Sequence, residues 1–275
     1  MADDDEPPIA DSGTVARVVD ALAGGKWALG RDRDIAAYIR QRFPGAAEAV
    51  HIAHGFHRRA ALWAVTQCIP PATGVIFASS GLPAPSGFLY SWAAQASPDA
   101  RFLYVNEDPK ITEIIRGALG QREPRVGAAT ACARCPAQVL STPQARELLA
   151  RGPVSLHIVN AAHRWPAGIA RETVAGYAEL LPPGSSLCLS AGSPARDPAT
   201  GEITPRAQEL LEVLRLAGGP VYPHRPEDVA SWIKGAKLVL HPAGVTDARR
   251  FGRPAPRGPL RDYPATVLEA VALRP

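Results

Sequence analysis

Residues 73–87 read Thr-Gly-Val-Ile-Phe-Ala-Ser-Ser-Gly-Leu-Pro-Ala-Pro-Ser-Gly. The apolar run Val75–Ala78 leads into a turn of small residues, Ser79–Gly81, and a helix-compatible segment follows. This order of strand, turn and helix is typical of the first unit of a nucleotide-type α/β fold, in which small residues let the backbone approach a ligand closely. The turn holds one glycine, however, where a cofactor-binding loop usually has two or three.

Short apolar runs alternate with helical segments through most of the remaining chain. We predict strands at 74–78, 101–106, 125–129, 154–160 and 185–190, later strands at 237–240 and 265–271, and later helices at 205–216 and 226–233. Strands that alternate with helices predict right-handed crossovers and a parallel sheet.

Three helices are predicted before the first strand, at 14–23, 33–43 and 46–69, from apolar residues at helical spacing and from the Gly and Pro residues that end them. We therefore predict an N-terminal helical cap over residues 13–70 and a Rossmann-like domain over 71–275, packed together as one compact unit. The polar, acidic residues 1–12 are expected to form a mobile tail.

The amino-acid composition limits the kinds of molecule that the protein is expected to bind. The net charge of +4 comes from scattered arginines, without a Lys/Arg run that interleaves with aromatic residues, so we expect no nucleic-acid partner. No apolar run approaches the ~20 residues that a membrane span needs. The acidic N-terminus is unlike a signal peptide, and the four cysteines are expected to be reduced thiols in a cytoplasm. The expected partner is a small molecule.

Ligands of such sheets bind beyond the carboxyl ends of the strands. This rule brings four segments around one crevice: 79–81, 106–108, 130–132 and 160–163. His163 follows the fourth strand and is a candidate general base, because imidazole titrates near neutrality. The alternative is that His163 bonds the backbone of its own loop.

Three blocks of the chain resemble actinobacterial SAM-dependent methyltransferases in sequence, order and spacing. Residues 16–26 read Ala-Arg-Val-Val-Asp-Ala-Leu-Ala-Gly-Gly-Lys and are similar to the pattern A-R-V-Y-D-Y-x-x-G-G-K. Residues 77–84 resemble D-I-G-T-G-L-P-T, and residues 104–109 resemble Y-V-D-N-D-P. The resemblance implies a class I methyltransferase fold, an α/β structure with a seven-stranded, mostly parallel sheet, helices on both faces and an N-terminal helical cap.

Several positions where the resemblance implies SAM contacts carry other residues here. Phe77 replaces an acid near the methionine end of SAM, Asn106 an acid that takes both ribose hydroxyls, and Cys132 an acid that faces the adenine. Ser79 replaces a glycine, and Glu107 is the one nearby acid able to replace Asn106 at the ribose. Each lost charged hydrogen bond weakens binding by about 1.5–3 kcal/mol, so we expect SAM to bind weakly or not at all.

The candidate ligand-binding residues come from the strand ends, the cap helices and the block at 16–26. They are Arg17, Asp20, His54, Ser79, Ser80, Gly81, Asn106, Glu107, Cys132 and Asn160. We expect no metal site. His51, His54 and His57 fan over about a third of their helix, and Cys132-x-x-Cys135 lacks the second pair that zinc would need. A redox dithiol stays the alternative for the cysteines.

These patterns favour a methyltransferase-family protein whose SAM pocket is degenerate. Such a pseudoenzyme would bind another small molecule, catalyse a SAM-independent step of secondary metabolism, or act in regulation. The alternative is a working SAM-dependent methyltransferase, of the EC 2.1.1 type, that acts on a small molecule. Fold analogy alone does not separate the two, because one fold hosts many functions.

Overall fold

The computed structural model describes residues 15–83, 87–120, 123–252 and 263–275, so the predicted tail lies outside the described residues. The described strands form one eight-stranded sheet in the order β3-β2-β1-β4-β5-β8-β6, with β7 beside β8. They are β1 Gly74–Ala78, β2 Arg101–Asn106, β3 Val126–Thr130, β4 Val154–Ile158, β5 Ser186–Pro194, β6 Val239–Leu240, β7 Thr246–Asp247 and β8 Ala265–Leu273.

Strands β1 to β5 are parallel to their neighbours, and β8 runs antiparallel to β5. This topology confirms the predicted Rossmann-like fold of the class I methyltransferase type. The sheet has eight strands in place of seven because the two-residue β7 also pairs with β8.

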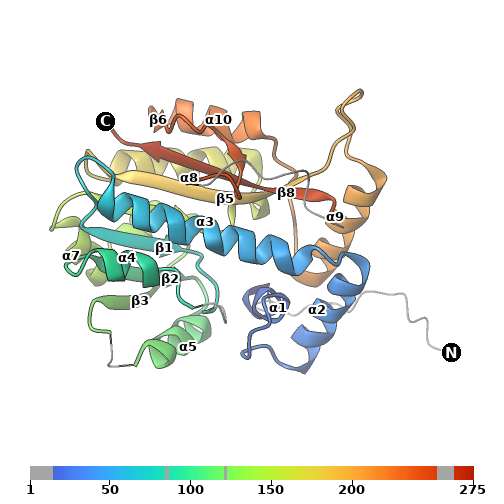
Figure 1. Cartoon of the computed structure of the whole chain (residues 1–275), viewed down its shortest axis with the longest axis horizontal. Helices are drawn as coiled ribbons and strands as arrows, with labels where there is room; N and C mark the ends of the chain where they lie inside the picture. Colours follow the sequence, from blue (N-terminus) through green and yellow to red (C-terminus); the bar gives the residue numbers. More distant parts are fainter. Residues whose placement is uncertain (1–14, 84–86, 121–122, 253–262) are drawn as a thin grey trace.

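Helices cover both faces of this sheet (Figure 1). They are α1 Val15–Leu22, α2 Gly30–Arg42, α3 Ala46–Thr66, α4 Ser91–Ala96, α5 Pro109–Leu119, α6 Pro136–Leu140, α7 Pro143–Leu149, α8 Ala167–Leu180, α9 Pro205–Gly218 and α10 Pro226–Gly235, with a 3-10 turn η2 at Ala162–Arg164. The long α3 crosses one face and packs with α4, while α8 and α10 pack together on the opposite face.

Strand β1 is apolar at every position because both of its faces are covered. Val75 and Phe77 pack into the cluster with α3, α4 and α5, while Ile76 and Ala78 pack into the cluster with α8 and α10. Successive side chains of a strand point to opposite faces, so a strand covered on both sides is apolar throughout. All five β1 residues are buried.

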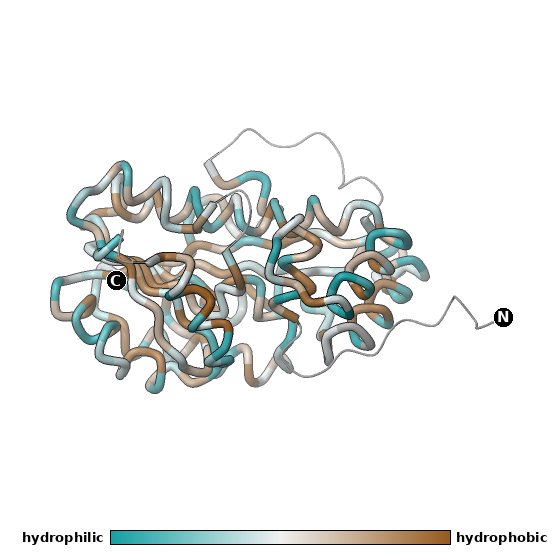
Figure 2. Tube along the Cα trace, turned by 90° about the horizontal axis from the view of Figure 1, so that it is seen from below, coloured by the Kyte–Doolittle hydropathy of each residue, from teal (hydrophilic) through white to brown (hydrophobic). Residues whose placement is uncertain are grey.

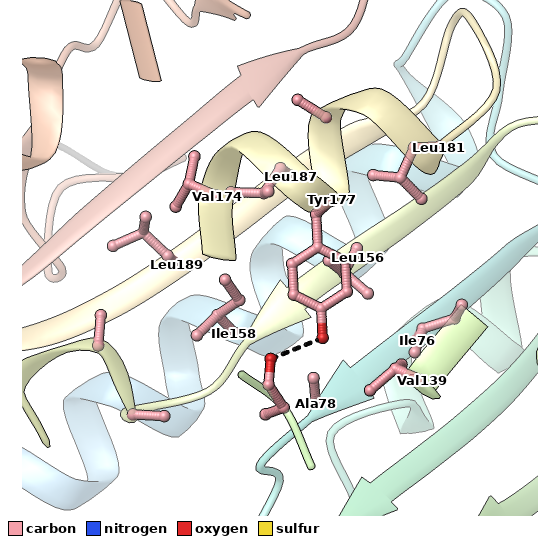
Figure 3. Close-up of a cluster of buried hydrophobic side chains, with 14 of the residues drawn as sticks. Ile76, Ala78, Val139, Leu156, Ile158, Val174, Tyr177, Leu181, Leu187 and Leu189 are labelled. Atoms are coloured by element: carbon pink, nitrogen blue, oxygen red, sulfur yellow. Dashed lines mark hydrogen bonds between the residues drawn. The ribbon is translucent and has the colours of Figure 1, made fainter. Parts of the chain in front are cut away.

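The core on the α8 face is closed by Tyr177 (Figure 3). Its ring lies among the apolar side chains of β4 and β5, and its hydroxyl donates a 2.9 Å hydrogen bond to the carbonyl oxygen of Ala133. Burial raises the pKa of this hydroxyl. A buried hydroxyl needs such a partner, and the bond fixes the loop after β3 against α8.

Helices α1, α2 and α9 gather with the start of α3 at the carboxyl ends of the parallel strands, on the right in Figure 1. Their inner faces share a cluster that includes Val18, Ile35 and Leu210. Figure 2 shows hydrophilic segments mostly at the outer turns of the helices. Among the described helices, none is both long and apolar enough to cross a membrane. The four cysteines are free thiols.

Candidate functional site

A cavity of about 430 Å³ opens at the carboxyl ends of β1, β2 and β4, and we call it the strand-end crevice. Predicted residues in its lining are His54, Ser79, Ser80, Gly81, Asn106, Glu107 and Asn160. The parallel strands bring these residues together because their carboxyl ends meet at one edge of the sheet. The volume lies in the range of about 300–1,000 Å³ that is typical of small-molecule sites.

Asn106 ties the end of β2 to the turn after β1. Its Nδ2 donates to Ser80 Oγ at 3.0 Å, and its Oδ1 accepts from the Gly81 N–H at 3.2 Å. The turn needs this support, because Ser79 has a φ of 58°, in the left-handed region that favours glycine. Asn106 is buried, and each end of its amide makes one hydrogen bond within the protein.

Glu107 lies next to this amide and is exposed on the rim of the crevice. Its Oε2 is 3.6 Å from Cys132 Sγ, which places the predicted Cys132 beside the rim and outside the lining. Desolvation and the neighbouring Cys132 raise the pKa of Cys135. Reactive dithiols have a lowered thiol pKa, and the shift at Cys135 is in the opposite direction.

His54 enters the crevice from α3, and its Nδ1 is buried without a partner among the described residues. Burial, helped by the charges of Arg58 and His51, lowers the pKa of His54 to about 4. The predicted trio does not act together, because His51 is exposed and His57 is fully buried. Within the described ranges, no group of three His, Cys, Asp or Glu side chains could hold a metal ion.

A second cavity of about 120 Å³ lies between the cap helices and the ends of β5 and β8, and we call it the cap pocket. Its walls are mainly apolar and include Val18, Leu22, Ile39 and Leu210. His163 lines this pocket instead of the strand-end crevice. Burial lowers the pKa of His163 to about 3, and its Nδ1 has no partner in the described part of the chain. A base with such a low pKa accepts a proton only weakly at neutral pH.

The two cavities meet at five shared lining residues: Val15, Val19, Asn160, Arg164 and Gly218. Arg164 is the charged residue of this junction and was missed by sequence reasoning. It stands in η2, directly after the predicted strand-end segment 160–163. A signal was available in its place four residues after Asn160, at a strand end.

Asn160 is held in a left-handed conformation, with a φ of 49°. Its N–H donates to Ser190 Oγ at 2.9 Å, and that oxygen lies 2.8 Å from His57 Nε2. His57 Nδ1 lies 3.0 Å from His157 Nδ1, and all three buried side chains are fully inaccessible to solvent. Burial is the main cause that lowers the pKa of both histidines, and it lowers the pKa of His157 to about 3. This neutral network anchors the junction from inside the core.

The structure places Arg17 and Asp20 outside both cavities. Arg17 Nε donates to Asp32 Oδ2 at 2.8 Å, and Asp20 Oδ2 accepts from the Trp27 N–H at 2.8 Å. Both side chains therefore organise the connection from α1 to α2. The residues of the block at 16–26 therefore have a structural role in the helical cap.

Phe77 also lies outside the lining of the crevice, contrary to the expectation that this position faces the methionine end of SAM. It is fully buried and packs against the rings of Tyr104 and His157, at centroid distances of 5.2 and 5.0 Å. The alternation of side chains along β1 turns this position toward α3.

A family model described as S-adenosyl methyltransferase matches residues 6–272. Among solved structures, a candidate methyltransferase from Thermobifida fusca YX is similar to the chain, with 25% identity, a TM-score of 0.81, and coverage of 98% of this chain and 96% of that one. A DUF574 family protein from Streptomyces avermitilis has 21% identity and a TM-score of 0.79, over 94% of this chain and 97% of that one. A search of the curated proteins finds no match.

Proposed function

The chain belongs to the S-adenosyl methyltransferase family, and from this premise we propose that it binds an apolar small molecule in the cap pocket and binds SAM only weakly. In this proposal the protein is a repurposed member of its family. It acts in regulation or in a SAM-independent step of secondary metabolism.

One observation carries the proposal: both ends of the Asn106 amide are bound within the protein, to Ser80 and Gly81. This is the position from which the resemblance expects an acid to take the ribose hydroxyls. Each end of the amide keeps one N–H or lone pair for a ligand, but a ribose hydroxyl could form only neutral hydrogen bonds there, and these are about half as strong as the charge-assisted bonds of an acid.

The charges of the crevice support the same conclusion. SAM carries a sulfonium, an ammonium and a carboxylate group, and the acids in the described lining are Glu107 and Asp108. Asp108 caps α5 by accepting from the Lys110 N–H at 2.8 Å, so Glu107 is the carboxylate left for a ligand. Glu107 can pair with only one of the two cationic groups of SAM, and a desolvated charge without a protein partner is costly. The residues present therefore fit SAM poorly.

The junction of the two cavities favours the alternative function, a working methyltransferase. A polar crevice and an apolar pocket that meet at Asn160 and Arg164 suit two different substrates held side by side. In this alternative, SAM supplies the methyl group, Glu107 holds the ribose from the rim, and an apolar acceptor occupies the cap pocket.

Calorimetric titration of SAM and of S-adenosylhomocysteine into the full chain separates the two functions. A dissociation constant in the millimolar range, or no heat of binding, is the expected result. A constant in the low micromolar range would overturn the proposal and make the working methyltransferase the favoured function. Glu107→Gln adds a second criterion, because it weakens SAM binding only if Glu107 holds the ribose.

A further inference from the structure

We infer that the ligand of the cap pocket is a small apolar acid whose carboxylate binds Arg164 at the junction of the two cavities. This inference rests on the proposed binding of a small molecule in the cap pocket. It adds the chemical class of that molecule.

Arg164 reaches the junction beside Gly218 at the end of α9, where a side chain would crowd its guanidinium. A Cβ atom at Gly218 would lie 3.3 Å from Arg164 Nη1, and one at Gly219 would lie 3.5 Å from Nη2. Arg164 also donates from Nη2 to the carbonyl oxygen of Gly218. The guanidinium is thereby fixed in place and still lines both cavities.

Among the described residues, the charge of Arg164 has no carboxylate partner. No Asp or Glu in the described ranges lies within ion-pair distance of it, and the Gly218 carbonyl is its hydrogen-bond partner there. Burial lowers its pKa, while the more distant charge of Glu107 acts in the opposite direction. A guanidinium has five N–H donors, so most of them are available to a ligand. A half-buried cation of this kind favours an anionic partner.

The walls of the cap pocket determine which ligand groups can accompany the carboxylate. Its described lining contains no Asp or Glu, so a protonated amine would meet the charge of Arg164 without compensation. The pocket of about 120 Å³ is somewhat smaller than the ~150 Å³ apolar cavity that holds benzene. One aromatic ring or a short branched chain, continued toward the junction by a carboxylate, suits this space. Asn160, His163 and Tyr263 are the other polar residues of its described lining.

Matched acids and amides test the inference on the wild-type chain. Benzoate, phenylacetate, 3-phenylpropionate and hexanoate are titrated at pH 7, each beside its primary amide, by calorimetry and ligand-observed NMR. Each pair has nearly the same shape and differs in charge. We expect the best acid to bind at least tenfold more tightly than its amide, as one charge-assisted contact provides.

Variants of the chain test whether Arg164 causes the preference for acids over amides. Arg164→Gln should weaken binding of the best acid about tenfold or more and leave its amide unchanged, while Arg164→Lys should retain part of the preference. Arg171→Gln is the matched control, because Arg171 is exposed on α8 and outside both cavities. Circular dichroism and thermal unfolding verify that each variant is folded.

The outcomes distinguish the inference from the proposed function. Equal binding of acids and amides overturns the inference and leaves apolar binding standing. Binding of neither set overturns the proposed function and the inference together. If Arg164→Gln weakens S-adenosylhomocysteine and leaves the best acid unchanged, Arg164 holds the amino-acid carboxylate of a nucleoside ligand, and the inference is wrong.

Discussion

At the scale of single residues, Asn106 sets the polarity of the strand-end crevice. Aspartate at this position would keep both internal contacts, because the Ser80 hydroxyl and the Gly81 N–H can each donate to a carboxylate. It would add a charge and spare lone pairs toward the crevice. We expect Asn106→Asp to bind SAM about tenfold or more tightly in calorimetry. Unchanged affinity would show that the ribose position is not what limits binding.

Ser190 gives a second prediction at this scale. Ser190→Ala removes the oxygen that accepts from the Asn160 N–H and leaves His57 Nε2 without its partner. Buried groups that lose a partner cost about 1–3 kcal/mol each, so we expect a loss of that order in the free energy of unfolding, measured in urea. Ser190→Thr retains the hydroxyl and serves as the control. A loss equal in both variants would assign the effect to packing instead of the hydrogen bonds.

Residue positions at strand ends could be predicted from the sequence, because a strand, a turn and a helix follow each other in a readable order. The partners of those residues could not. The sequence shows Asn106 and Ser80 as separate polar residues, and only the parallel register of β1 and β2 brings the amide to the turn. The same limit explains Phe77, whose direction depends on which helix covers each face of the sheet.

At the scale of elements, the turn between α1 and α2 depends on Gly25. A Cβ atom there would lie 1.9 Å from Asp20 Oδ1, and the same carboxylate holds the Trp27 N–H. Gly25→Ala must therefore displace Asp20, and we expect a loss of about 1–3 kcal/mol in chemical denaturation. Gly30→Ala, at the start of α2, is the control, because its Cβ would meet nothing within 4 Å. Equal stability of both variants would contradict this account of the turn.

Helices and strands with a strong apolar period were predictable as elements, and their ends were less so. The predicted strand 185–190 extends to Pro194 in the structure, because β5 continues to pair with β8 over its whole length. The partner strand lies more than seventy residues further along the chain, so no local pattern reports this pairing. The two-residue β7 escapes prediction for the same reason.

At the scale of the whole molecule, the crevice and the cap pocket differ in how far a sequence can predict them. The crevice follows from topology, because parallel strands end at one edge. The cap pocket forms only when α1, α2 and α9 meet the end of β8. These elements come from both ends of the chain. Arg164 gains its place at the junction only through this assembly.

The stability of the whole molecule should also depend on pH in two directions. His54, His57, His157 and His163 have folded-state pKa values below their ordinary 6.5, chiefly through burial. Below pH 6.5 the unfolded chain therefore binds more protons than the folded chain, and the free energy of unfolding falls as the pH falls.

Glu269 acts in the opposite direction. Burial raises its pKa from 4.5 to about 8, and neither carboxylate oxygen has a partner among the described residues. Between these values the folded chain holds the extra proton, so its contribution to stability is lost as the pH rises toward 8. The histidines outnumber this one acid, so we expect maximal stability near pH 6.5–7. Urea unfolding from pH 4 to 9 measures the fall of stability on both sides of this maximum.

Glu269→Gln should reduce the fall of stability above pH 6.5 and keep the fall at acid pH, since glutamine carries no proton to lose. If the free energy of unfolding of this variant still falls as steeply above pH 6.5, the fall is caused by other groups.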